Sequence, residues 1–166
     1  DINKNQKPVN PDLIWDLNGE MIPSEKEGII SNVTKFLNNE DGGPLFYKIY
    51  YPSTGIKQKT DMVKISAICI AIKKGKIVDE FTLQNIKNLL YDKDSLICVK
   101  KVASALSKYF EIFKINFPNN WGLQSKGFIL TNGGISVIVG LFEKILSRIM
   151  QKNGREPNKE DFEFYT

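Results

Sequence analysis

The sequence of 166 residues contains no histidine and only two cysteines. The absence of histidine excludes Ser-His-Asp and Cys-His triads and every zinc site that uses a His ligand. Cys69 and Cys98 stand 29 residues apart within apolar runs, which favours buried thiols over a disulfide or a metal pair. Carboxylates occur in small clusters near expected surface ends, where solvated charges are the ordinary interpretation. We therefore predict no catalytic site, no metal site and no cofactor.

Long apolar runs are also missing. No stretch of 18 consecutive apolar residues and no signal peptide occurs, so we expect a soluble, cytoplasmic chain with no membrane contact. Hydrophobic residues make up 42% of the sequence, enough for a real core in a single domain of this length. Because the sequence starts with Asp1 rather than Met, a C-terminal fragment of a larger protein is the alternative to a single domain.

Arginine is scarce, whereas lysine is abundant. Of 23 basic residues, all but Arg148 and Arg155 are lysine. This composition weakens a prediction of base-specific DNA recognition, for which bidentate Arg is the commonest tool. The positive charge is concentrated in residues 42–126, which hold fourteen Lys and six acidic residues.

The apolar pattern predicts an α+β fold, mostly helical, with a small antiparallel β-hairpin packed on long helices. Residues 1–23 are expected to form an extended arm with one short helical turn at 12–17, residues 24–154 the core, and residues 155–166 a tail that is a further helical turn or a loose end. The hairpin is predicted from strands at 45–51 and 62–72, joined by a long tip.

Four core helices are predicted. The first follows a capping box at Ser24–Glu27 and is stopped by Gly42 and Gly43. A short helix is expected at 82–90. The two longest are expected at 94–117, ended by Pro118, and from a cap at Thr131 or Asn132 to Gly154.

The predicted hairpin would gather lysines beside Tyr47, Tyr50 and Tyr51. Basic residues interleaved with aromatic residues suit the backbone of a nucleic acid. The alternative is the ordinary lysine-rich surface of a protein from an AT-rich genome. The candidate DNA-binding residues are Lys57, Lys59, Lys64, Lys73, Lys74 and Lys76.

Several segments resemble one protein family. Residues 2–17, INKNQKPVNPDLIWDL, resemble the IN-x-x-Q-x-x-V-x-x-x-L-x-x-D-L stretch of DGQHR-domain proteins, a family that includes DndB, associated with DNA phosphorothioate modification. Later segments resemble the family in the same order along the chain. These are Asn38–Asp41, Phe46–Ile49, Tyr109-Phe110, Phe117-Pro118, Trp121 and Thr131–Ile135.

The DGQHR signature itself is absent, because the chain has no histidine. In the family this signature precedes the IN-x-x-Q stretch, so the resemblance implies that this chain corresponds to the C-terminal part that follows it. The family's active residues are therefore not carried over. Only Asn3 and Gln6 match a polar family motif, and capping of backbone groups is the alternative role for both.

The leading hypothesis is a non-catalytic, DNA-associated module of a bacterial protein that acts in DNA modification, regulation or phage defence. The alternative is a protein-interaction or oligomerisation domain without DNA contact, with the chain itself or other proteins of a DNA-modification system as partners. It rests on an excess of apolar residues in the last long helix: Ile135, Val137, Ile138, Val139, Leu141 and Phe142. A third hypothesis makes this chain the supporting part of an enzyme.

Overall fold

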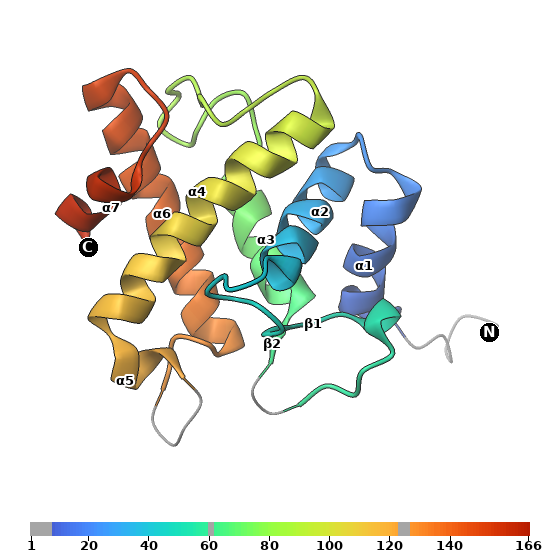
Figure 1. Cartoon of the computed structure of the whole chain (residues 1–166). Coiled ribbons are helices and arrows are strands. Elements are labelled where there is room, and N and C mark those ends of the chain that lie inside the picture. The colour runs from blue at the N-terminus through green and yellow to red at the C-terminus, as the bar shows by residue number, and fades with distance from the viewer. Residues whose placement is uncertain (1–7, 60–61, 123–126) are drawn as a thin grey trace.

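The computed structural model describes residues 8–59, 62–122 and 127–166. These residues are mostly helical (Figure 1). Short elements, β1 (Ile49–Tyr50), the 3-10 helix η2 (Pro52–Thr54) and β2 (Val63–Lys64), lie between the second and third α-helices. The α-helices are α1 (Pro11–Met21), α2 (Lys26–Asn39), α3 (Ile65–Lys74), α4 (Ser95–Asn116), α5 (Pro118–Trp121), α6 (Asn132–Asn153) and α7 (Lys159–Tyr165).

The two predicted long helices are confirmed. Asp94 caps α4, because its carboxylate accepts hydrogen bonds from the backbone N–H of Leu96 at 2.9 Å and of Ile97 at 3.2 Å. Thr131 caps α6 by accepting from Gly134 N at 3.0 Å. Gly154 ends α6 in the left-handed region, with φ of 62°, a conformation that glycine adopts without a steric penalty.

The helix predicted after Ser24 is also present, but the predicted capping box is wrong. Glu25 occupies the N-cap of α2 and its side chain makes no capping hydrogen bond. Glu27, which the box would direct back to the helix start, instead accepts a hydrogen bond from Lys73 at 2.7 Å. A contact with another helix therefore replaces the local motif.

The predicted antiparallel hairpin is wrong. The two strands are two residues each and pair in parallel, with Ile49 opposite Val63 and Tyr50 opposite Lys64. Most of the second predicted strand is α3. Its buried apolar positions have the helical spacing i, i+3, i+4 and i+7. They are Ile65, Ile68, Cys69 and Ile72.

The short helix predicted at 82–90 does not form. The segment is an irregular loop with an isolated antiparallel bridge between Phe81 and Lys87. Asn88 fixes its course, because the buried Asn88 amide donates to Ile77 O at 2.8 Å and to Asp79 O at 2.9 Å. Side-chain bonds of this kind compete with helix formation.

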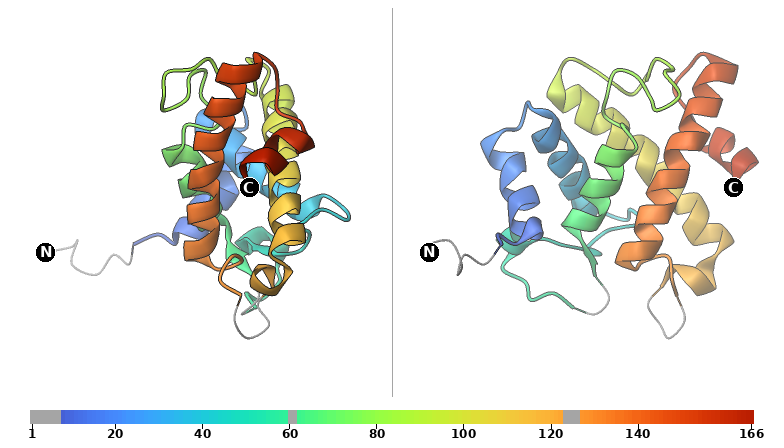
Figure 2. Two further views of the ribbon diagram at one scale, coloured as in Figure 1. Left: turned by 90° about the vertical axis from the view of Figure 1, so that its left-hand side faces the viewer. Right: turned by 180° about the vertical axis from the view of Figure 1, so that it is seen from behind.

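The helices form two packed groups that share one core. α1 packs on α2, and α3 lies between this pair and α6 (Figure 2). On the other side α4 packs against α2 and α7. The buried Tyr109 of α4 stacks near Phe142 of α6 and Phe162 of α7, at ring-centroid distances of 5.1 and 5.6 Å. The C-terminal segment expected to be a turn or a loose end is thus the docked helix α7.

Candidate functional site

The six candidate lysines do not form one cluster, since the hairpin that was to gather them is absent. Lys57 and Lys59 lie on the exposed loop after η2, and Lys64 directly precedes α3. The other three lie at the far end of this ten-residue helix, about 15 Å away along its axis. Asn3 and Gln6 lie outside the described residues.

Two of the candidate lysines are engaged in ion pairs. The Lys64 ammonium lies 3.8 Å from the carboxylate of Asp12, which is buried. The Lys73 ammonium lies 2.7 Å from Glu27 Oε1, and its hydrogen bond is the main cause of the lowered pKa of Glu27. Both lysines therefore have less charge to offer to a ligand than the sequence suggested.

Lys74 and Lys76 are exposed at the end of α3 and are joined there by cations from α6. α3 and α6 run side by side on the face seen in the right-hand view of Figure 2. Lys74 and Lys144 line one shallow cavity of about 360 Å³. Lys144 and Arg148 line a neighbouring cavity of about 380 Å³. We call the set Lys74, Lys76, Lys144 and Arg148 the α3–α6 cationic surface.

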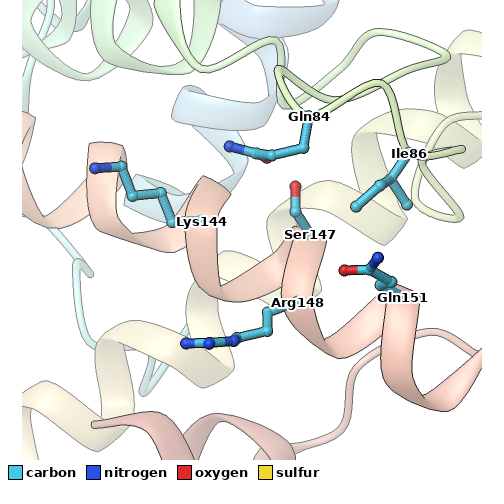
Figure 3. Close-up of a pocket in the computed structure, with 6 residues that line it drawn as sticks. All are labelled: Gln84, Ile86, Lys144, Ser147, Arg148 and Gln151. Atoms are coloured by element: carbon cyan, nitrogen blue, oxygen red, sulfur yellow. The ribbon is translucent and has the colours of Figure 1, made fainter.

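The second cavity shows how these charges are presented. Lys144 and Arg148 stand one helical turn apart on α6, and in Figure 3 their charged ends point to the same side. Gln84, from the irregular loop, Ser147 and Gln151 complete the polar lining. Within the described residues, no acidic side chain forms an ion pair with any member of the α3–α6 cationic surface. The four charges are thus free to meet an anion.

Glu143 lies beside this surface, but it is buried and hydrogen-bonded to other groups. Its carboxylate accepts hydrogen bonds from Leu83 N at 3.2 Å, Gln84 Nε2 at 3.4 Å and Ser147 Oγ at 3.1 Å. These bonds attach the irregular loop to α6. The carboxylate is therefore an anchor for the loop and not a direct counter-ion of Lys144.

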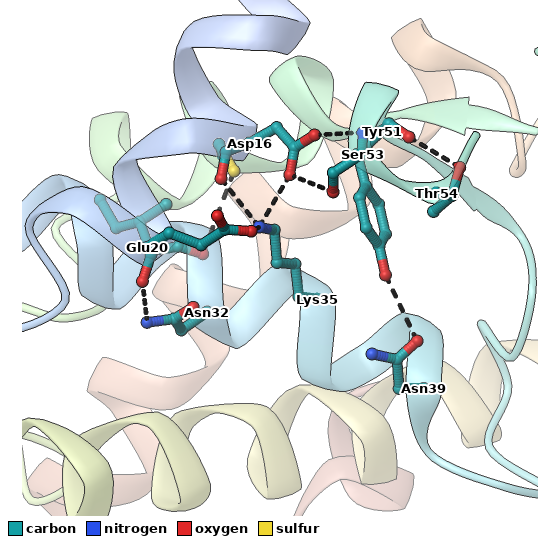
Figure 4. A network of polar contacts seen from close by, with 11 residues as sticks. Asp16, Glu20, Asn32, Lys35, Asn39, Tyr51, Ser53 and Thr54 are labelled. Atoms are coloured by element: carbon teal, nitrogen blue, oxygen red, sulfur yellow. Dashed lines mark hydrogen bonds and ion pairs between the residues drawn. The ribbon is translucent and has the colours of Figure 1, made fainter. Parts of the chain in front are cut away.

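A second polar cluster, which the sequence did not indicate, joins α1, α2 and η2 (Figure 4). Asp16 is buried and accepts from Ser53 N at 2.6 Å and Ser53 Oγ at 2.9 Å. Lys35 Nζ lies 2.7 Å from Asp16 Oδ1 and 5.5 Å from the Tyr51 ring centre. Burial raises the pKa of Asp16, but the bonds from Lys35 and Ser53 outweigh it, so the pKa is lowered. Every charge here has a partner inside the fold, which indicates a structural role.

The sequence contains a weak signal for the second polar cluster and none for the cations of α6. Asp12 and Asp16 are spaced i, i+4 around Trp15, and all three are buried on the inner side of α1. The sequence pattern alone does not show which side of such a helix faces inward. Lys144 and Arg148 were missed because they lie about 70 residues after Lys74 and Lys76 in the sequence.

The cysteines are both free and buried, as predicted. Burial raises the pKa of the Cys69 thiol to about 12, against the effect of a contact with Thr34. Such a thiol is a poor nucleophile and a poor metal ligand. Among the described residues, no three His, Cys, Asp or Glu side chains gather as a metal site. None of the described helices has the length and apolar character needed to cross a membrane.

Comparison with known proteins gives no family assignment. No family model, no curated protein and no solved structure matches the chain. The function is therefore argued from the geometry of the α3–α6 cationic surface.

Proposed function

We propose that the chain is a non-catalytic, DNA-associated module that binds the phosphate backbone through the α3–α6 cationic surface. One observation carries this proposal. Lys74, Lys144 and Arg148 line two adjoining cavities, the exposed Lys76 follows two residues after Lys74, and no described acid forms an ion pair with any of the four. Unpaired cations close together are the means by which proteins displace the counterions of DNA.

The composition of this surface favours contact without sequence recognition. Three of its four members are lysines, which act as point charges towards phosphate, and Arg148 alone has the planar fork that reads guanine. Phosphate contacts position a protein on a duplex but do not specify bases. The role proposed is thus to hold the protein on DNA, with sequence selection supplied by other groups.

The resemblance to DGQHR-domain proteins agrees with this role. In that context the chain would serve a bacterial system for DNA modification, its regulation or phage defence, in the cytoplasm. The lysines first selected contribute unequally. Lys74 and Lys76 belong to the surface, whereas Lys64 and Lys73 are held by Asp12 and Glu27, and Lys57 and Lys59 lie at the opposite end of α3.

The test is fluorescence anisotropy with a labelled 30-base-pair duplex at several salt concentrations. For four phosphate contacts, the slope of log K against log salt is about −3.6. The triple variant Lys74→Gln, Lys144→Gln, Arg148→Gln is expected to reduce the slope to about −1 and to weaken binding at 50 mM salt by at least tenfold.

The matched control removes the same number of charges from the opposite side of the molecule. Lys93→Gln, Lys100→Gln and Lys108→Gln change exposed lysines on or directly before α4. This control should lose less than threefold in affinity. Equal losses in both triple variants would reject the α3–α6 cationic surface as the binding site. Absence of any salt-dependent binding by the wild type would favour the alternative interaction domain, which the exposure of Val137 and Leu141 on α6 supports.

A further inference from the structure

The helix α1 has its polar and apolar sides reversed. Its buried positions are Asp12, Trp15, Asp16 and Gly19. Its outer side is apolar, whereas a surface helix normally presents its polar side to water. The exposed apolar residues are Leu13, Ile14, Leu17 and Met21 on the helix and Val9, which precedes it.

The reversal follows from what the inner side does. The Asp12 carboxylate accepts from Ser66 N at 3.2 Å in the first turn of α3, and Asp16 accepts from Ser53 N at the start of η2. These carboxylates bind helix starts, where orphan N–H groups favour negative charge. The two aspartates must face inward to make these contacts, so the apolar residues of α1 are left on its outer side. No packing among the described residues accounts for their apolar character.

The size of the outer patch suits a partner. Met21 is 74% exposed, and the other four residues are between 39% and 61% exposed. Together they leave on the order of 400–500 Å² of apolar surface in water, which is the size of the largest apolar patch on a typical monomer, a kind of patch that is often functional. We call these five residues the α1 apolar face.

The charges at the two ends of α1 are opposite. Glu20 lies in the last turn, where Lys35 is 3.6 Å from its carboxylate, and the exposed Glu25 occupies the N-cap of α2 four residues after the end of α1. At the other end, η2 lies beside the start of α1 (Figure 1 and Figure 2), and segment 55–59, which follows η2, carries the exposed Lys57 and Lys59. When the α1 helices of two copies lie antiparallel, the cationic end of each copy faces the acidic end of the other.

We propose that the α1 apolar face binds a second copy of this chain, with the two α1 helices antiparallel about a two-fold axis. A two-fold contact uses the same patch on both copies, so one self-complementary face is sufficient. It buries the apolar face twice, and with a polar rim the total reaches about 1,200 Å², the lower limit for a specific stable interface. This inference does not depend on DNA binding, because the α3–α6 cationic surface is made by other elements.

The first test is sedimentation equilibrium of the full chain from 1 to 500 µM. The wild type is expected to shift from monomer to dimer over this range. The variant Leu17→Gln, Met21→Gln should associate at least tenfold more weakly. The matched control Leu96→Gln, Ile115→Gln changes two exposed apolar residues on α4 and should associate like the wild type. Circular dichroism verifies that both variants stay folded.

A charge-reversal series tests the antiparallel arrangement. Glu25→Lys alone and Lys57→Glu alone should each weaken the dimer at low salt, because each puts like charges together. Both changes in one chain should restore association, since each end again faces its opposite. A wild type that stays monomeric at 500 µM would overturn the proposal and leave the face to a partner of another sequence. Equal weakening by the α4 control, or no restoration in the double reversal, would also reject it.

Discussion

At the scale of single residues, buried charges determine how the first half of the chain is assembled. Asp16 connects three elements, because it lies on α1, pairs with Lys35 of α2 and accepts two hydrogen bonds from Ser53 of η2. A buried pair of this kind contributes little compared with apolar packing of the same volume, but loss of one partner leaves the other charge uncompensated. The structure therefore depends on both partners being present and ionised.

Substitution Asp16→Asn is expected to lower the free energy of unfolding by about 2 kcal/mol at pH 7, since the amide keeps the shape but leaves Lys35 without a counter-charge. The pKa of Asp16 is lowered from its ordinary value of 3.8. The stabilisation by the carboxylate is thus complete above the unfolded pKa and is lost as the pH falls through the folded pKa. Urea unfolding at pH 7 and at pH 3 measures both effects.

The control for this substitution is Asp41→Asn, because Asp41 is exposed in the turn after α2. It should change stability by less than about 0.5 kcal/mol at either pH. If the difference between wild type and Asp16→Asn stays constant from pH 7 to pH 3, the pKa of Asp16 is the same in the folded and unfolded states, and the proposed stabilisation by charge pairing is wrong.

At the scale of elements, the sequence predicts what local chemistry decides. α4 and α6 were predicted because each combines a capping side chain, a long apolar stripe and a Pro or Gly stop. The hairpin was wrong because residues 65–72 are both β-branched and spaced for a helix. Because the exposed side of this run carries the apolar Ile70 and no charge, the run lacks the polar pattern that distinguishes a strand from a helix. Only the packing of this run between α2 and α6 determines that it forms the helix α3 and not a strand.

The loop at 81–87 is attached to α6 through the carboxylate of Glu143. Glu143 accepts from Leu83 N and Gln84 Nε2, so Glu143→Ala is expected to detach the loop from α6. We expect amide hydrogen exchange at Leu83 and Ile86 to accelerate about tenfold or more, corresponding to a local loss of about 1–3 kcal/mol. Exchange within α4 should change little.

Lys144→Ala is the control, because Lys144 is next to Glu143 in the sequence but is exposed on the outer side of α6. It should leave the exchange of Leu83 unchanged. Faster exchange throughout the chain in Glu143→Ala would mean that the carboxylate supports the whole core, and the interpretation as a loop anchor would fail.

At the scale of the whole molecule, distance along the chain limits what the sequence reveals. Lys74 and Lys76 were selected from local charge density, and in the structure Lys74 lines a cavity while Lys76 is exposed two residues after it. Lys144 and Arg148 complete it only because α6 packs beside α3. The α1 apolar face escaped prediction for the same reason, since only the folded chain shows that the two aspartates face inward.

The C-terminal helix gives a test of how far the core extends as one unit. Phe162 of α7 is fully buried and lies 5.6 Å from the ring centres of both Tyr109 and Phe142, so it belongs to the same aromatic cluster as α4 and α6. Phe162→Ala should cost about 3–4 kcal/mol through lost burial and the remaining cavity. Its neighbour Phe164 is 75% exposed, and Phe164→Ala should cost less than about 1 kcal/mol.

Urea unfolding followed by tryptophan fluorescence and by circular dichroism distinguishes a core that unfolds as one unit from a core in which α7 unfolds separately. Trp15 of α1 and Trp121 of α5 report on distant parts of the fold. If α7 and the first half share one cooperative unit, Phe162→Ala moves both transitions together to lower urea. A fluorescence transition that stays in place while the helical signal shifts would show that α7 unfolds separately. Because the buried residues form one continuous cluster from Trp15 to Phe162, coincident transitions are the expected result.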